Sequence, residues 1–251
     1  MNLIGAGAVV SAILAHFVRQ RDRYQRESDE LLLNMLPAPI ATRLKSSHEM
    51  IAEEFDGVSV LSADIVDFTQ MSSRMTPEAL VGLLNDVFSR FDAFVDDLGL
   101  EKIKTVGDAY MAAAGVPMRR ADHAIAIAEL ALRIQETLAR EQFHGHRLAM
   151  RIGINSGPVV AEIIGRHKFA YDLWGDAVNT ASRMESVGIG GAIQITQATH
   201  DLIRDAYRCE PRGEVGVKGK GSMPAYLLIG RLRSTTPSAS PNASLSGPAP
   251  G

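Results

Sequence analysis

Two aspartates that lie 44 residues apart in the sequence are placed where they could bind a metal ion. Asp64 lies near the end of the apolar run 58–65, and Asp108 follows Gly107 in a tight turn. A carboxylate at the end of a buried strand is costly unless it is hydrogen-bonded or neutralised by a cation. Two carboxylates and main-chain carbonyls are hard oxygen ligands that suit Mg²⁺ or Mn²⁺, with phosphates completing the shell. The alternative is a helix-capping acid and an unrelated turn acid, and spacing alone leaves both open.

The segments around these acids predict a strand, a helix and a hairpin in that order. Residues 58–65 are β-branched and apolar, as in a buried strand. A helix is predicted after Thr76, because Thr76 is an N-cap residue type followed by proline, apolar positions recur at helical spacing, and Gly99 follows the last turn. Residues 100–115 predict two short strands with Asp108 at the turn between them.

The rest of the core continues this alternation and predicts an α+β fold. The order β-α-β-β-α-β with C-terminal additions is the split, ferredoxin-like pattern, for which we expect a mixed sheet with helices on one face. In this order we expect the first strand and the first strand of the hairpin to be neighbours, which would bring the two aspartates together. The further elements expected are a helix over 121–142, two strands around a turn at Asn155-Ser156-Gly157 within 147–165, a helix over 174–188, a strand over 192–196, a short helix over 196–207 and a hairpin over 214–230.

Composition and missing motifs exclude several classes of protein. The chain has 251 residues, 46% of them hydrophobic, and a net charge of −3, so it can form a sizeable core and lacks the basic excess typical of nucleic-acid binding. The single cysteine, Cys209, excludes an internal disulfide and a cysteine-cluster metal site. The sequence contains no Walker A, dinucleotide-binding, H-E-x-x-H or G-x-S-x-G motif. His144 and His146 are expected in a solvated loop.

The two ends of the chain differ from its core. Residues 2–18 carry no charged side chain, and a basic cluster follows over 19–26. A run of about 17 uncharged residues is at the lower limit for a membrane span, and the basic cluster would lie on the cytoplasmic side. A signal peptide would carry its charge before the apolar run, and a helix packed on a partner is the other alternative. We expect a membrane segment over 1–18, a membrane-associated protein with its following domain in the cytoplasm, and a disordered Pro/Ser/Ala/Gly tail over 231–251.

A helical linker is predicted between the apolar segment and the core, over residues 19–54. It contains a weak heptad, so a short parallel coiled coil is one option. Pro37 and Pro39 are expected to break the helix. We interpret the segment as a linker that transmits a signal from the membrane to the core. The heptad consists of Phe17, Tyr24 and Leu31.

Five separated motifs give the sequence a specific family resemblance. The chain resembles the catalytic domain of class III nucleotidyl cyclases, and among them the bacterial membrane-linked adenylyl cyclases, over roughly residues 34–230. The resemblance implies a catalytic domain over 55–230 that converts ATP to 3′,5′-cyclic AMP and pyrophosphate in intracellular signalling. The matching stretches are SADIVDFT (62–69), EKIKTVGDAYM (101–111), RIGINSGPVVAEIIG (151–165), YDLWGDAVNTASRMES (171–186) and VKGKG (217–221), with NMLPAPIATRL (34–44) in the linker.

The resemblance implies that Asp64 and Asp108 bind two divalent cations, Mg²⁺ or Mn²⁺. The backbone carbonyl of Ile65 is expected to add a ligand. One cation would lower the pKa of the ribose 3′-hydroxyl and the other would hold the triphosphate, as in other two-metal phosphoryl transfers. Asp67 falls at a variable position of the motif and is interpreted as structural.

Lys104 and Asp172 match the residues that select the purine. Adenine offers an acceptor at N1 and an amino donor at N6, so a lysine can donate to the first and an aspartate can accept from the second. Guanine inverts both groups, and a guanylyl cyclase would need an acceptor at 104 and a small Cys or Ser at 172. The pair therefore favours ATP, because mispairing leaves buried polar groups without partners. Without the resemblance, Lys104 would be an ordinary exposed strand lysine.

Asn179 and Arg183 match the pair that acts on the transition state. They lie four residues apart on a predicted helix and so project from one face. The asparagine would orient the ribose, and the arginine would neutralise charge that develops on the phosphoryl oxygens. The alternative is a surface arginine that pairs with the nearby Glu185.

Further substrate contacts are implied at the phosphates. Lys218, between two glycines, matches a lysine that grips the outer phosphates, and Lys220 is the second choice. Phe68 and Thr69 lead into a helix whose N–H groups could bind phosphate.

The resemblance also implies a head-to-tail homodimer with two shared active sites. In this family the metal ligands come from one protomer and the purine and transition-state residues from the other, and this chain carries both sets. Two alternatives are a guanylyl cyclase and a catalytically silent dimerisation or relay module. No nucleic-acid partner is expected.

Overall fold

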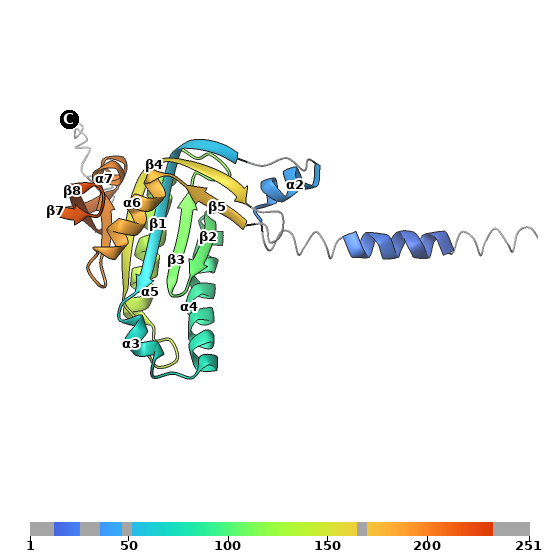
Figure 1. Ribbon diagram of the computed structural model, residues 1–251, viewed down its shortest axis with the longest axis horizontal. Coiled ribbons are helices and arrows are strands. Elements are labelled where there is room, and N and C mark those ends of the chain that lie inside the picture. The colour runs from blue at the N-terminus through green and yellow to red at the C-terminus, as the bar shows by residue number, and fades with distance from the viewer. Residues whose placement is uncertain (1–12, 26–35, 47–51, 165–169, 233–251) are drawn as a thin grey trace, which may run out of the picture.

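The computed structural model describes residues 13–25, 36–46, 52–164 and 170–232 (Figure 1). Its regular elements are α2 (Ala38–Ser46), β1 (Ala52–Ile65), α3 (Phe68–Ser72), α4 (Pro77–Asp97), β2 (Glu101–Val106), β3 (Ala109–Ala114), α5 (His123–Arg140), β4 (Met150–Ile164), β5 (Ala170–Trp174), α6 (Asp176–Ser186), β6 (Ile193–Thr196), α7 (Gln197–Ile203), β7 (Tyr207–Val217) and β8 (Gly221–Arg231).

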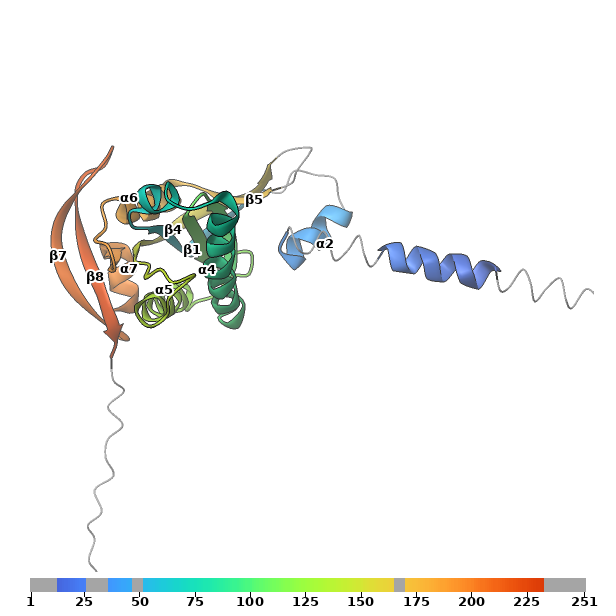
Figure 2. The same ribbon diagram turned by 90° about the horizontal axis from the view of Figure 1, so that it is seen from below.

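A mixed eight-stranded sheet organises the chain. Its strand order is β2-β3-β1-β4-β6-β8-β7, and β5 pairs with β4 off this path. The segment β1-α4-β2-β3-α5-β4 forms the predicted ferredoxin-like core, with β1 antiparallel to both β3 and β4. The α+β class and the β-α-β-β-α-β order of the core are therefore confirmed. The long β7–β8 hairpin lies at the far end of the sheet from α4 (Figure 2).

Helices cover both faces of the sheet, so the expectation of helices on one face is wrong. Leu61 and Ala63 of β1 pack in the cluster formed with α4 and α5. Val58 and Val60 pack in a second cluster with α2 and α6. Because side chains alternate along a strand, apolar residues at both even and odd positions of β1 are buried on opposite faces of the sheet, and both faces require cover.

The β2–β3 hairpin pairs with β1 through its second strand, β3. The predicted pairing of β1 with the first strand of this hairpin is therefore wrong. The register pairs Ala63 with Tyr110 of β3, and β2 forms the edge of the sheet. Burial explains this choice. The strand β3 buries Tyr110 and the alanines 112–114, whereas every residue of β2 retains solvent exposure, as an edge strand can.

One long strand, β4 (Met150–Ile164), stands in place of the two strands around a turn that are predicted within 147–165. Asn155 and Ser156 lie within β4, where they pair with Val60 and Ser59 of β1. Their polar side chains are buried, and tertiary contacts satisfy them. Ser156 Oγ lies 2.6 Å from Ser59 Oγ, and Asn155 Nδ2 donates to the carbonyl of Ala177 at 3.1 Å. Turn-forming residue types are compatible with a strand when neighbouring elements supply the hydrogen bonds that a turn would otherwise provide.

Several local predictions are confirmed. Thr76 caps α4, since its side chain accepts from the amide of Ala79 at 3.3 Å. Gly99 has a φ of 60° after the last turn, a conformation that glycine adopts without strain. Cys209 is half-buried and unpaired. His144 lies in a loop, where its Nε2 is 2.8 Å from Asp86 Oδ2.

The described parts of the N-terminal region are helical. One helix covers residues 13–25. The helix α2 begins at Ala38 with Pro39 in its first turn, where a missing N–H costs little, so these prolines start a helix. Among the residues described, no helix is both long and apolar enough to cross a membrane. Most of the predicted membrane segment, part of the heptad and nearly all of the predicted tail lie outside the described residues.

Candidate active site

The two aspartates meet at one end of the sheet. Asp64 is the penultimate residue of β1, and Asp108 occupies the β2–β3 turn next to Gly107, whose φ is 62°. Burial and the adjacent Asp64 carboxylate raise the pKa of Asp108 to about 6, and the main-chain N–H of Ile65 acts in the opposite direction. Asp108 lies in the turn that leads into β3. The two acids therefore come together as the sequence predicts, although β1 pairs with β3 and not with β2.

The acid pair has the chemistry of a divalent cation site. Two adjacent carboxylates repel one another, and this repulsion adds to burial, the larger cause, in raising the pKa of Asp108. A bound cation would relieve it with ligands of the type that Mg²⁺ and Mn²⁺ prefer. Within the described segments, no group of three or more His, Cys, Asp or Glu side chains is arranged to hold a metal. Main-chain and phosphate oxygens would have to complete the shell.

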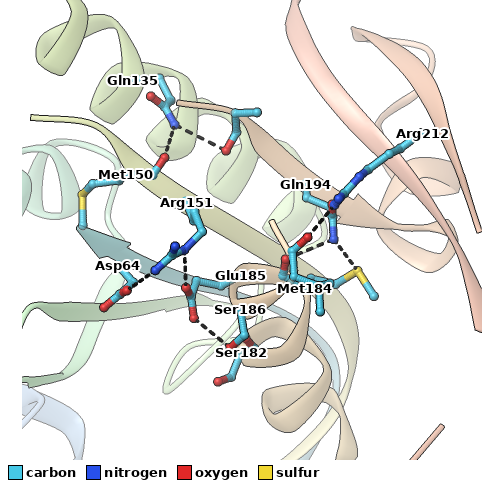
Figure 3. Close-up of polar contacts among 12 residues, drawn as sticks. Asp64, Gln135, Met150, Arg151, Ser182, Met184, Glu185, Ser186, Gln194 and Arg212 are labelled. Carbon is cyan, nitrogen blue, oxygen red and sulfur yellow. Dashed lines mark hydrogen bonds and ion pairs between the residues drawn. The ribbon is translucent and has the colours of Figure 1, made fainter. Parts of the chain in front are cut away.

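Arg151 is the residue at this site that the sequence analysis did not single out. It is the register partner of Asp64 across β1 and β4, and its Nη2 lies 2.8 Å from Asp64 Oδ2. Its Nε lies 3.4 Å from Oε1 of the buried Glu185 on α6 (Figure 3). The hydrogen bond with Asp64 raises the pKa of Arg151, and burial raises that of Glu185. The only sequence signal was the position of Arg151 at the start of an apolar strand.

Lys104 and Asp172 are brought together. Lys104 Nζ lies 2.6 Å from Asp172 Oδ2, and the main-chain amide of Leu173 donates to Asp172 Oδ1 at 2.8 Å. Asp172 lies on β5, a strand that the sequence analysis did not predict, and β5 pairs with β4 over Val160–Ile164. The lysine side chain is 40% exposed and the aspartate 19% exposed, so the pair remains accessible to a ligand.

The helix α6 carries Asn179 and Arg183. Asn179 is exposed and Arg183 is half-buried. A Cβ placed on Gly219 would lie 3.6 Å from Arg183 Nη1, so the guanidinium lies against the β7–β8 turn. Glu185 binds Arg151, and Arg183 forms no ion pair within the described part of the chain. The alternative of an Arg183–Glu185 surface pair is therefore wrong.

The two candidate phosphate lysines differ in their surroundings. Lys220 forms an ion pair with Asp176 at the start of α6. Lys218 is exposed and has no ion pair with any residue in the described ranges. Of the two, Lys218 is the one whose ammonium is available to an anionic ligand.

Phe68 and Thr69 begin the five-residue helix α3. Phe68 is partly buried and packs against the main core, so its side chain does not point into a ligand site. Thr69 is exposed. The preceding Asp67 has a φ of 56° and makes no side-chain cap. At this position only the main-chain N–H groups of the first turn are candidates for a phosphate contact.

The predicted site residues form separate groups within one chain. The acid pair lies at the end of β1, the Lys104–Asp172 pair lies between β2 and β5, and Arg183 lies against the β7–β8 turn. No hydrogen bond or ion pair between residues in the described segments joins Lys104 or Asp172 to the acid pair. The three groups therefore occupy separate positions within one protomer.

Comparison with known proteins identifies the family of this chain. Residues 50–230 match the family described as "Adenylate and Guanylate cyclase catalytic domain". An adenylate cyclase of Mycobacterium tuberculosis is 46% identical over 212 residues, which is 84% of this chain and 48% of that protein. The human atrial natriuretic peptide receptor 2 is 41% identical over 215 residues, which is 83% of this chain and 20% of the receptor. The chain thus spans about half the length of the mycobacterial relative.

Solved structures give the same result. The guanylate cyclase domain of RhGC from Catenaria anguillulae, in complex with GTP, has a TM-score of 0.70 and 37% identity, covering 72% of this chain and 100% of that one. The adenylyl cyclase CyaB from P. aeruginosa has a TM-score of 0.67 and 26% identity, covering 73% and 98%. The order of the sheet, the paired aspartates and the matched residues lead to one conclusion: this chain belongs to the class III adenylyl and guanylyl cyclase catalytic domains.

Proposed function

We propose that this nucleotidyl cyclase is an adenylate cyclase that converts ATP to 3′,5′-cyclic AMP and pyrophosphate. The observation that carries this choice is the contact between Lys104 Nζ and Asp172 Oδ2 at 2.6 Å. A donor and an acceptor lie side by side at the spacing of adjacent groups on a base. The edge of adenine needs this order, with an acceptor at N1 and a donor at N6.

The cations would be held by Asp64 and Asp108, with the carbonyl of Ile65 as a further ligand. When bound, two Mg²⁺ or Mn²⁺ ions supply activation of the ribose hydroxyl and charge neutralisation at the triphosphate. The chain's own task at this position is to hold two carboxylates close together despite their repulsion. The strand β1 and the β2–β3 turn do so because the β1–β3 pairing fixes the turn beside the strand end.

Three further groups of residues would bind and orient the substrate. Asn179 would donate to the ribose and keep its 3′-hydroxyl in line with the α-phosphorus. Arg183 would stabilise charge that develops on the phosphoryl oxygens, because a guanidinium is a fixed, permanently charged donor. The exposed Lys218 would bind the outer phosphates, and the main-chain N–H groups of Phe68 and Thr69 would provide further contacts.

The complete site would form between two copies of the chain. No hydrogen bond or ion pair among the described residues joins the acid pair to the Lys104–Asp172 pair within one protomer. A head-to-tail homodimer would place each acid pair opposite the partner's purine and transition-state residues. Such a dimer has two equivalent sites, whereas a lone protomer has none. The guanylyl cyclase domain of the RhoGC fusion protein from Blastocladiella emersonii, 34% identical, is described as a non-canonical dimer, which supports the capacity of this fold to pair but not one particular arrangement.

We also propose that the N-terminal apolar segment, over 1–18, attaches the protein to a membrane and leaves the catalytic domain in the cytoplasm. The support is the uncharged run followed by four arginines within eight residues. Segment 19–54 would act as the helical linker, 55–230 as the catalytic domain and 231–251 as a disordered tail. Fractionation of cells that express the chain with and without residues 1–18 tests the anchor. Both forms in the soluble fraction would contradict it.

The first test of function is cyclic nucleotide production by the purified full chain with Mn²⁺ and either ATP or GTP. The proposal expects cyclic AMP from ATP, little product from GTP, and specific activity that rises with protein concentration as dimers form. Asp64→Ala is the control for contaminating cyclases. Folded protein that makes no product at any concentration would favour a silent relay module.

A guanylyl cyclase is the second candidate. It is supported by 41% identity to the receptor-type guanylate cyclase gcy-28 of Caenorhabditis elegans and by the structural likeness to a guanylate cyclase domain solved with GTP. Overall likeness does not choose between the purines. A rhodopsin-guanylyl cyclase "with converted specificity", 39% identical to this chain, was solved in complex with ATPαS, which indicates that this fold accepts either purine. The residues at the base edge therefore decide, and Lys104 with Asp172 favours adenine.

A further inference from the structure

Buried side chains of the sheet bind main-chain carbonyls at both ends of α6. At the N-terminal end, Asn155 Nδ2 of β4 donates to the carbonyl of Ala177 at 3.1 Å. At the C-terminal end, Gln194 Nε2 of β6 donates to the carbonyl of Met184 at 3.0 Å (Figure 3). Met184 directly follows Arg183, so Gln194 holds the peptide group next to the proposed transition-state residue.

Gln194 lowers the stability of the fold, so a purely structural role does not explain its presence. Its side chain is fully buried, and its Oε1 atom has no hydrogen-bond partner among the described residues. A buried acceptor without a partner lowers stability, and an apolar side chain of the same size would avoid this cost. Departures of this kind are expected where a position serves function.

Other contacts limit how α6 can move. The helix lies directly on β4, because a Cβ on Gly153 would be 2.1 Å from the amide nitrogen of Glu185. Arg212 Nη1 of β7 donates to the carbonyl of Val187 at 2.8 Å, and Arg151 reaches Glu185. Loss of the Gln194 contact would therefore loosen the last turns of α6 without detaching the helix.

We propose that Gln194 is a positioning residue for Arg183. By holding the carbonyl of Met184, it keeps the last turns of α6 in place and the Arg183 guanidinium against the β7–β8 turn at Gly219. This inference rests on the proposed cyclase function, because it assigns Gln194 to the half of the shared site that contains Asn179 and Arg183.

The substitution Gln194→Met tests the proposal. Methionine has a similar length and no amide, so the donor to Met184 and the unpartnered acceptor disappear together. Gln135→Met is the matched control. Gln135 Nε2 of α5 also binds main-chain carbonyls, at 3.1 Å from Met150 O and 3.4 Å from Ala192 O, and neither carbonyl belongs to α6. The Gln194→Met variant loses one unpartnered acceptor, Gln194 Oε1, and leaves another, the Met184 carbonyl, so we expect its melting temperature to stay close to that of the wild type.

Hydrogen exchange provides a readout that does not depend on catalysis. Amides in the segment 176–190 should exchange about five- to tenfold faster in Gln194→Met, the range expected for one net hydrogen bond, and at the wild-type rate in Gln135→Met. Unchanged exchange in Gln194→Met would overturn the proposal. A wild type that makes no cyclic nucleotide would instead contradict the proposed function, and the exchange measurement would still decide whether Gln194 restrains α6.

Kinetics and subunit mixing complete the test. The kcat of Gln194→Met should fall about ten- to a hundredfold, the scale of a small misplacement of a catalytic group. The KM for ATP should stay within twofold, because Lys104 and Asp172 lie on other elements. Mixing with Asp64→Ala should restore activity, and mixing with Arg183→Ala should not. If mixing with Asp64→Ala also fails to restore activity, the substitution has damaged the fold in general, and the assignment of Gln194 to one half of the site is overturned.

Discussion

Lys104 of β2 and Asp172 of β5 lie 68 positions apart in the sequence, yet their side chains form an ion pair with Nζ 2.6 Å from Oδ2. The two strands that carry them are not paired with each other: β2 pairs with β3, and β5 pairs with β4. The contact therefore depends on the fold of the whole sheet. Each residue alone is an ordinary polar residue near a sheet edge. Together they offer a donor and an acceptor to a purine edge.

Exchanging this pair should change which purine is used. In Lys104→Glu with Asp172→Cys, the groups facing the base invert, and kcat/KM for ATP should fall about a hundredfold or more while GTP use rises, because mispaired polar groups lose their partners. Parallel assays with both nucleotides measure the effect. Unchanged ATP kinetics in the folded double variant would show that these residues do not read the base.

Subunit mixing should reveal a shared site. Asp64→Ala and Arg183→Ala should each be nearly inactive alone. Equal mixing should restore about a quarter of wild-type activity, because half of the dimers formed at random are heterodimers and each keeps one intact site. The measurement is cyclic AMP production before and after mixing, with heterodimers verified by differential tags. Heterodimers that form without any recovery would contradict the shared site.

Glu101 should make stability depend on pH. Burial and the nearby Asp96 raise the pKa of Glu101 to about 7. Because the folded form binds its proton more tightly than the unfolded form, the stability it contributes is complete below about pH 4.5 and is lost as the pH rises towards 7. Glu101→Gln should therefore be more stable than the wild type at pH 8, by about 2–3 kcal/mol.

Urea unfolding of both proteins at pH 4.5 and pH 8 checks this prediction. The difference between the proteins should shrink towards zero at the lower pH, where the carboxyl group is neutral in both states. An equal difference in stability at the two pH values would rule out burial of the Glu101 charge as its cause.

Gly153 should be intolerant of any side chain. A Cβ there would lie 2.1 Å from the amide nitrogen of Glu185 and 2.4 Å from the carbonyl oxygen of Ala181, both backbone atoms of α6. Gly153→Ala must push the helix off β4, and we expect a loss of about 3 kcal/mol in unfolding free energy and most of the activity. Gly157→Ala is the matched control on the same strand, because its Cβ meets only Ala177 Cβ at 3.4 Å. Equal melting temperatures of the two variants would contradict this close packing.

Much of the fold was predictable because it rests on local patterns. A run of β-branched and apolar residues identified β1, and capping identified the start of α4. The prediction failed at β4, where Asn155 and Ser156 suggested a turn. Those residues bind Ala177 and Ser59, which lie far away in the sequence, so no local signal could show that a strand continues through them.

The sequence by itself determined the chemical inventory of this protein. The two aspartates, the lysine–aspartate pair and the asparagine and arginine of one helix face are residue types in recognisable motifs, and these motifs placed the chain in its family. Chemical type and short-range spacing are properties that a sequence carries directly.

Only the tertiary structure decided which of these residues meet. In the folded chain, β1 pairs with β3 instead of β2, and Asp172 lies on a strand, β5, that pairs with β4. Arg151 forms an ion pair with Asp64, and Gln194 donates to the carbonyl of Met184, the residue after Arg183. The physical reason is that strand order and helix placement follow from burial on two faces of a sheet. That burial depends on segments far apart in the sequence, which only folding brings into contact.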